Sequence, residues 1–150
     1  MVNPSAPKNQ MVGVFNLELL RLYTYLYQDS DKNYSLVHDL GGYDEISLTN
    51  SVKIVSNKSE VLFSAEDLGL QNNSQQAIFG GNSVAEASKI FKTIIAGQGT
   101  EAQNNVVCAN AGLAIATAKQ LTHIEGYELA KEALFSGKAN QCLTKLIALS

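Results

Sequence analysis

The chain has 150 residues, of which 45% are hydrophobic and 17% are charged, and its 14 acidic and 11 basic residues give a formal net charge of −3. This composition is typical of one ordinary globular domain and not of a disordered chain. The basic residues form no cluster, so the sequence predicts no nucleic-acid interface. No apolar run is long enough to span a bilayer and no signal-peptide pattern is present, which predicts a cytoplasmic protein without a membrane partner.

The first part of the chain predicts one helix and one strand. Residues 1–12 contain both prolines and are expected to be irregular. Asn16 is a suitable N-cap for a helix of residues 17–28. A short, mostly apolar strand is expected at 34–38, where the double glycine Gly41-Gly42 closes it.

A hairpin is expected next. Residues 52–56 and 61–64 alternate between apolar and polar side chains, and the polar turn Asn57-Lys58-Ser59 separates them. This period of two predicts two strands with one covered face. The Gln-, Asn- and Gly-rich stretch 67–81 is expected to be a loop.

The second half of the chain predicts four helices. Three of them begin with capping boxes, in which a Ser or Thr is followed three residues later by Glu or Gln, and these are Ser83/Glu86, Thr100/Gln103 and Thr122/Glu125. Gly97 and Gly137 are expected to end the first and third of these helices. A fourth helix is expected at about 139–149.

The apolar positions of these helices predict which faces are buried. The first helix has one apolar stripe that includes Val84 and Phe91, and residues 106–118 are apolar nearly all round, which predicts burial on most sides. In the last helix, Leu146 and Ile147 are expected to face inward, together with Leu143. The order of elements predicts a single α/β domain over residues 1–150, with a thin mixed sheet of three or four strands covered by about five helices.

Asp44 and Glu45 are the most informative candidate site residues. They are adjacent carboxylates that follow an apolar strand and a double glycine, where the backbone turns tightly. Carboxylate oxygens suit Mg²⁺, which proteins usually hold through one or two carboxylates plus substrate phosphates. A general acid–base pair is less favoured, since adjacent residues on an extended chain point apart. The remaining alternative is solvated surface charge.

Other polar residues favour structural roles. His38 ends the first predicted strand and is expected to be a hydrogen-bonded structural histidine, whereas His123 is expected at the surface. Asn110 lies within an apolar helix and is expected to bond that helix to a loop. Cys108 and Cys142 are expected to be small buried hydrophobic residues in a reducing compartment.

Five short segments occur in a characteristic order and spacing: Val2-Asn3-Pro4 with Pro7, Val12-Gly13-Val14-Phe15, Leu36-Val37-His38, Asp44-Glu45-Ile46-Ser47 and Asn110-Ala111. Taken together, they resemble the C-terminal portion of the anthranilate phosphoribosyltransferase family over essentially the whole chain. The resemblance implies transfer of a phosphoribosyl group from phosphoribosyl pyrophosphate to anthranilate in tryptophan biosynthesis. It also implies that Asp44 and Glu45 help to hold Mg²⁺ against the pyrophosphate, and that the segment from Asn3-Pro4 to Pro7 lies near the acceptor.

The resemblance also implies that parts of the enzyme are absent and that the mixed sheet is partial, belonging to a larger one. Members of this family begin with a helical domain, carry a Gly-Thr-Gly-Gly-Asp loop that cradles the pyrophosphate, and use an arginine to grip anthranilate. This chain has no Gly-x-Gly-Gly-Asp string, and its only arginine is Arg21, in the first predicted helix. We therefore expect a partial domain that is inactive alone, with an N-terminal half or a homodimer as its protein partner. The alternatives are a related phosphoribosyltransferase or nucleoside phosphorylase, and a non-catalytic interaction module derived from the fold.

Overall fold

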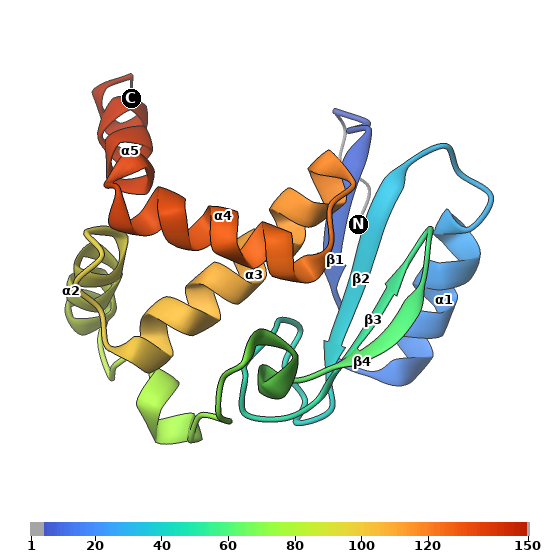
Figure 1. Cartoon of the computed structure of the whole chain (residues 1–150), viewed down its shortest axis with the longest axis horizontal. Coiled ribbons are helices and arrows are strands. Elements are labelled where there is room, and N and C mark those ends of the chain that lie inside the picture. The colour runs from blue at the N-terminus through green and yellow to red at the C-terminus, as the bar shows by residue number, and fades with distance from the viewer. Residues whose placement is uncertain (1–4, 150) are drawn as a thin grey trace.

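The computed structural model describes residues 5–149 (Figure 1). In chain order the elements are β1 (Asn9–Gly13), α1 (Leu17–Tyr27), β2 (Asn33–Asp39), β3 (Val52–Ser56), β4 (Glu60–Phe63), the short 3₁₀ helices η1 (Ala65–Leu68) and η2 (Gln75–Ile78), α2 (Val84–Ile95), α3 (Glu101–Lys119), α4 (His123–Phe135) and α5 (Lys138–Ala148). In this part of the chain, no helix is long and apolar enough to cross a membrane.

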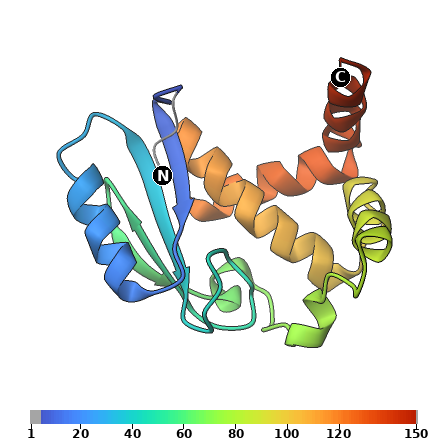
Figure 2. The same ribbon diagram turned by 180° about the vertical axis from the view of Figure 1, so that it is seen from behind.

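The four strands form one mixed sheet in the order β1-β2-β3-β4. β1 runs parallel to β2, whereas β2, β3 and β4 are joined by antiparallel pairings. Helix α1 covers one face of the sheet, and α3 with α4 lies on the other (Figures 1 and 2). The predicted α/β class with a thin mixed sheet and five helices is therefore confirmed.

The central strand β2 separates two apolar cores. Neighbouring residues of a strand point to opposite faces. Val37 accordingly packs in the core beneath α3 and α4, while Leu36 packs in the smaller core beneath α1. Both side chains are fully buried. The strand is apolar on both faces because both faces are covered, as in parallel sheets.

Strand β1 was not predicted, since residues 1–12 were expected to be irregular. It is defined by its pairing, with Asn9 opposite Asn33 and Gly13 opposite Val37. The Asn33 side chain also donates a 2.7 Å hydrogen bond to the Asn9 side chain across the pair. Its sequence has no period-two pattern of apolar and polar residues. Pairing with β2, and not its own polarity pattern, therefore makes this segment a strand.

The local signals for helix starts are confirmed. Capping boxes are complete at Thr100 and Thr122. In each box the Thr hydroxyl accepts from the N–H of the third helical residue, and the side chain of that residue accepts from the N–H of the Thr. At Ser83 the box is only half formed. The Ser83 hydroxyl accepts from Glu86 N–H, but the Glu86 carboxylate accepts from the N–H of Asn82 instead.

Helices α3 and α4 cross with their backbones in contact. A Cβ on Gly126 would lie 2.2 Å from the carbonyl oxygen of Gly112, and a Cβ on Gly112 would lie 2.6 Å from the backbone nitrogen of Tyr127. Real Cβ atoms do not approach backbone this closely, so only glycine at both positions permits this crossing.

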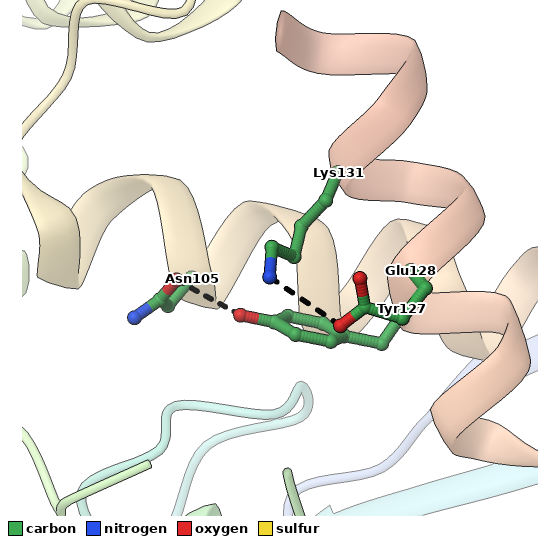
Figure 3. A network of polar contacts seen from close by, with 4 residues as sticks. All are labelled: Asn105, Tyr127, Glu128 and Lys131. Atoms are coloured by element: carbon green, nitrogen blue, oxygen red, sulfur yellow. Dashed lines mark hydrogen bonds and ion pairs between the residues drawn. The ribbon is translucent and has the colours of Figure 1, made fainter. Parts of the chain in front are cut away.

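A polar network fixes the same pair of helices (Figure 3). The Tyr127 hydroxyl on α4 donates a 2.9 Å hydrogen bond to the side-chain oxygen of Asn105 on α3. The Lys131 ammonium lies 5.2 Å from the centre of the Tyr127 ring, a cation–π distance, and 3.3 Å from the Glu128 carboxylate. Burial is the main cause that raises the pKa of Tyr127 to about 12, so the hydroxyl stays protonated and donates.

Two residues lie in environments that the sequence did not indicate. His123 was expected at the surface, but it is half-buried and packs edge-on against Phe63, with ring centres 5.5 Å apart. Burial lowers the pKa of His123, partly opposed by Asp67, because the charged imidazole loses hydration there. Cys108 is buried as predicted, whereas Cys142 is exposed, and both thiols are free.

The predicted burial of α3 on most sides is confirmed, apart from one stripe. Within residues 106–118, Cys108 and Leu113 are buried, and the exposed positions are Val107, Ala111, Ala114 and Ala118. These four positions recur every three or four residues, so they lie on one side of the helix. Three of them are alanines, which leave little apolar surface in water when they are exposed.

Helices α2 and α5 expose their apolar stripes at the end of the molecule away from the sheet (Figure 1). No residue of either helix is fully buried. On α2, Val84 is 88% and Phe91 is 51% exposed. On α5, Leu146 and Ile147 are 66% and 64% exposed, so the prediction that they face inward is wrong. Amphipathicity identifies an apolar face but not whether another element covers it.

The exposed stripes predict that the isolated chain self-associates, and polar substitution in them should reduce this association. The double change Phe91→Ser and Leu146→Ser removes exposed apolar surface, so the free energy of unfolding should change by only about 0.5 kcal/mol per site. Light scattering would measure association, and urea unfolding would measure stability. The control Leu113→Ser changes a buried side chain and should destabilise strongly. Unchanged scattering for the double variant would contradict the prediction.

Candidate functional site

Asp44 and Glu45 lie at the edge of the sheet where its two parallel strands end. β1 ends at Gly13 and β2 at Asp39, and because the strands are parallel, both carboxyl ends meet at this edge. The loop that follows β2 carries the two acids (Figure 2). In open sheets with parallel strands, ligands bind outside the carboxyl ends. The fold thus places the predicted pair where such sheets bind ligands.

The first support of this loop is the buried carboxylate of Asp39. One of its oxygens accepts a 2.7 Å hydrogen bond from Gly41 N–H, and the other accepts from the hydroxyl of Ser47. The Asp39 N–H donates to the carbonyl of Tyr43 at 3.0 Å. A fully buried carboxylate must be satisfied by hydrogen bonds, and here all of them come from the loop. The sequence analysis did not identify Asp39; its signal was an Asp at a strand end, two residues before the first glycine of the double glycine.

The second support comes from Asn110 on α3. Its side-chain oxygen accepts from Ile46 N–H at 2.9 Å, and its amide nitrogen donates to the carbonyl of Ile46 at 2.8 Å. The predicted bond from helix to loop is therefore confirmed. Its partner is the residue that directly follows Glu45.

The third constraint is steric, at Gly13. A Cβ on Gly13 would lie 1.7 Å from the carbonyl oxygen of Asp44. The backbone of the acidic pair therefore rests directly on the end of β1, which only glycine permits. The resemblance included Gly13 in one of its segments, but the sequence analysis gave it no role.

The loop leaves this edge through a strained residue. Leu48 has φ of 56°, a left-handed conformation that is unfavourable for a bulky residue with a Cβ. Its side chain is fully buried in the main core, which offsets that cost, and its carbonyl accepts a 2.7 Å hydrogen bond from Asn73 N–H. Strained backbone clusters at active sites and ligand-binding sites, although in this chain the helix-ending Gln120 has a similar φ of 61°.

His38 has the structural role that the sequence predicted. It is buried, and its Nδ1 lies 3.0 Å from the carbonyl oxygen of Val14. This contact ties the end of β2 to the segment that follows β1. Asn3 and Pro4, which the resemblance places near the acceptor, lie outside the described residues.

The acidic pair is suited to bind a hard cation only with additional ligands. Both side chains are exposed, and within residues 5–149 neither carboxylate takes part in a hydrogen bond or an ion pair. Partial loss of hydration, followed by the charge of Asp44, raises the pKa of Glu45, so a cation would relieve an unfavourable negative charge. The described residues contain no group of three or more His, Cys, Asp and Glu side chains that could hold a metal. The donor set therefore fits Mg²⁺, which completes its shell with water and phosphate oxygens.

Two clefts of the described chain lie elsewhere. One, with a cavity volume of about 420 Å³, opens at the other end of β2 beside Tyr34 and Thr117. Another, of about 580 Å³, lies between the 69–73 segment and the start of α3. Neither is lined by Asp44 or Glu45, so position at the strand ends and open coordination identify the candidate site, not cavity size.

Gly13→Ala should displace the acidic loop and destabilise the chain. The added methyl group overlaps backbone that cannot move freely, and such overpacking costs about 1–3 kcal/mol. Urea unfolding would measure the loss. Gly80→Ala is the matched control, because no atom lies within 4 Å of its Cβ position. Equal stability of the two variants would show that the loop does not depend on this close approach.

Comparisons with known proteins agree with this arrangement. A model of the "Glycosyl transferase family, a/b domain" matches residues 1–140. The anthranilate phosphoribosyltransferase of Flavobacterium psychrophilum is 58% identical over 150 residues, which make up 100% of this chain and 46% of that protein. The chain thus spans about half the length of the curated relatives it matches.

Solved structures show the same fold. The anthranilate phosphoribosyltransferase of Thermus thermophilus superposes with a TM-score of 0.80 at 26% identity, over 91% of this chain and 41% of that one. The Saccharomyces cerevisiae enzyme in complex with phosphoribosyl pyrophosphate and Mg gives a TM-score of 0.76 at 18% identity, over 91% of this chain and 40% of that one. The resemblance found in the sequence is thereby confirmed.

Proposed function

The chain belongs to the glycosyl transferase family defined by its a/b domain, and on this premise we propose that it supplies the Mg²⁺-holding part of an anthranilate phosphoribosyltransferase. The observation that carries this proposal is the exposed pair Asp44 and Glu45, placed at the ends of two parallel strands on a loop supported from three sides. The reaction is transfer of a phosphoribosyl group from phosphoribosyl pyrophosphate to anthranilate.

The relatives support the substrates. The yeast enzyme is described in complex with phosphoribosyl pyrophosphate and Mg, and separately with 4-fluoroanthranilate. We infer the same donor, metal and acceptor for this chain when it acts with the remainder of the enzyme. That remainder would be an N-terminal half, and a homodimer partner is a further candidate for association. The cytoplasmic location stays a prediction.

The chain's own residues would act by positioning. Asp44 and Glu45 would offer carboxylate oxygens to Mg²⁺, while Asp39 and Asn110 keep the loop backbone in place. When bound, the metal supplies charge neutralisation for the departing pyrophosphate, which needs no proton transfer from the protein. The residues that cradle the pyrophosphate and grip the acceptor would come from the part of the enzyme that this chain does not contain.

The isolated 150-residue chain should show no phosphoribosyl transfer. It has no Gly-x-Gly-Gly-Asp string, and its single arginine lies on α1. Each missing group that stabilises the transition state is worth a factor of about 100 or more. A hybrid enzyme, in which these 150 residues replace the matching segment of the Flavobacterium psychrophilum relative, should be active with Mg²⁺. An assay of anthranilate consumption would compare the two.

Turnover by the isolated chain would show that it is self-sufficient. A folded but inactive hybrid would instead favour the alternative of a non-catalytic interaction module.

Asp44→Asn and Glu45→Gln in the hybrid enzyme should impair use of phosphoribosyl pyrophosphate much more than use of anthranilate. Each change removes a charged oxygen ligand, so both the KM for the pyrophosphate substrate and the Mg²⁺ concentration for half-maximal rate should rise by about tenfold or more. Steady-state kinetics at varied Mg²⁺ would measure both. The control Glu18→Gln, on α1 at the other face of the sheet, should have no effect. Unchanged metal dependence in both acid variants would refute the assignment.

A further inference from the structure

The Asn110 side chain bonds to both the N–H and the carbonyl of one residue in the loop that carries Asp44 and Glu45. Its side chain accepts from the N–H and donates to the carbonyl of Ile46, at 2.9 and 2.8 Å. We propose that Asn110 is a positioning residue that sets the orientation of Glu45 for metal–pyrophosphate binding. This inference rests on the proposed function, because it assigns a role to Asn110 only through the acidic pair.

The link between Asn110 and Glu45 is a single peptide plane. The nitrogen of Ile46 belongs to the peptide bond that joins it to Glu45, and that unit is planar. A hydrogen bond to this N–H therefore restrains the backbone at Glu45 itself. The bond to the Ile46 carbonyl restrains the following peptide plane in the same way, so the chain cannot rotate between the two anchors without breaking one of them.

Asn110 is itself held rigidly. Its amide nitrogen also donates to the carbonyl of Val106 at 3.0 Å, one helical turn earlier. On either side of it along α3, Cys108, Ala109 and Leu113 are buried in the main core. The loop is thus anchored to a packed helix and not to another loop.

A second anchor, Asp39, should keep the loop attached when Asn110 is replaced, so the expected loss concerns metal binding and not folding. Asp39 holds Ser47 through two bonds to one carboxylate oxygen, and it holds Gly41 through the other oxygen. If Asn110 is removed, these bonds remain and the loop stays attached to the sheet. The acidic pair then loses its orientation while the fold is kept, which distinguishes positioning from general stability.

The structure offers a matched control on the same helix. Asn105 is half-buried like Asn110 and makes one side-chain bond to another element, from the Tyr127 hydroxyl at 2.9 Å. Asn105→Ala removes that bond without touching the loop. Both variants should lower the melting temperature, so melting temperature alone does not test the inference.

The experiment measures binding of Mn²⁺ with pyrophosphate to the hybrid enzyme by electron paramagnetic resonance, which does not require turnover. Asn110→Ala should weaken this binding about tenfold, the effect expected from the loss of two hydrogen bonds. Asn105→Ala should change it by less than about twofold. In kinetics, Asn110→Ala should raise the KM for phosphoribosyl pyrophosphate and leave the KM for anthranilate unchanged. Hydrogen exchange of the peptide that contains Ile46 should accelerate in Asn110→Ala alone.

Each outcome decides one assignment. If Asn110→Ala binds Mn²⁺–pyrophosphate as tightly as the parent, or if Asn105→Ala weakens binding equally, the positioning role is refuted. If Asp44→Asn and Glu45→Gln abolish binding while Asn110→Ala does not weaken it, only this inference fails. If the two acid variants also bind normally, the proposed metal site fails and the inference fails with it.

Discussion

The contact between Gly112 and Gly126 is the constraint on which the rest of the structure depends. It lets α3 and α4 pack backbone to backbone, and the side chain of Tyr127 then spans to Asn105 on the neighbouring helix. A pair of helices joined in this way behaves as one layer against the sheet. Any larger side chain at the crossing would separate the helices and move the whole face of α3 that meets the sheet and the acidic loop.

That layer and the sheet hold the loop between them. Asp39 binds it from the end of β2, Asn110 binds it from α3, and Gly13 supports it from the end of β1. These groups come from three elements, and each of them contacts the backbone of the loop. The carboxylates of Asp44 and Glu45 are left exposed and without bonds among the described residues, which is what a cation needs if it must also accept ligands from a substrate.

Sequence signals succeeded where the responsible interaction is local. The caps at Asn16, Thr100 and Thr122 involve partners three residues away, so a short window contains the whole interaction. The signals failed where the deciding partner is remote. β1 exists because β2 lies beside it, and the exposure of Phe91 reflects the lack of a covering element among the described residues, which no pattern within α2 can report.

The candidate site also contains features that local sequence signals indicate and features that depend on remote partners. The metal role of Asp44 and Glu45 came from the family resemblance and stays a prediction. The type of contact made by Asn110 was predictable because a polar side chain in an apolar helix requires a partner. The identity of that partner was not predictable, since Ile46 is 64 positions away and its backbone carries no side-chain signal. The clash avoided at Gly13 was equally hidden, because a glycine in a strand has several explanations and only the packed structure selects one.

The acidic loop is oriented by contacts within the described residues, whereas the apolar stripes of the outer helices α2 and α5 are not covered by them. The contacts from Asp39, Asn110 and Gly13 that orient the loop all lie within residues 5–149. The apolar stripes of α2 and α5, in contrast, have no cover in this part of the chain. If the chain acts as proposed, this separation would let the acidic pair stay fixed while the surrounding parts assemble against it.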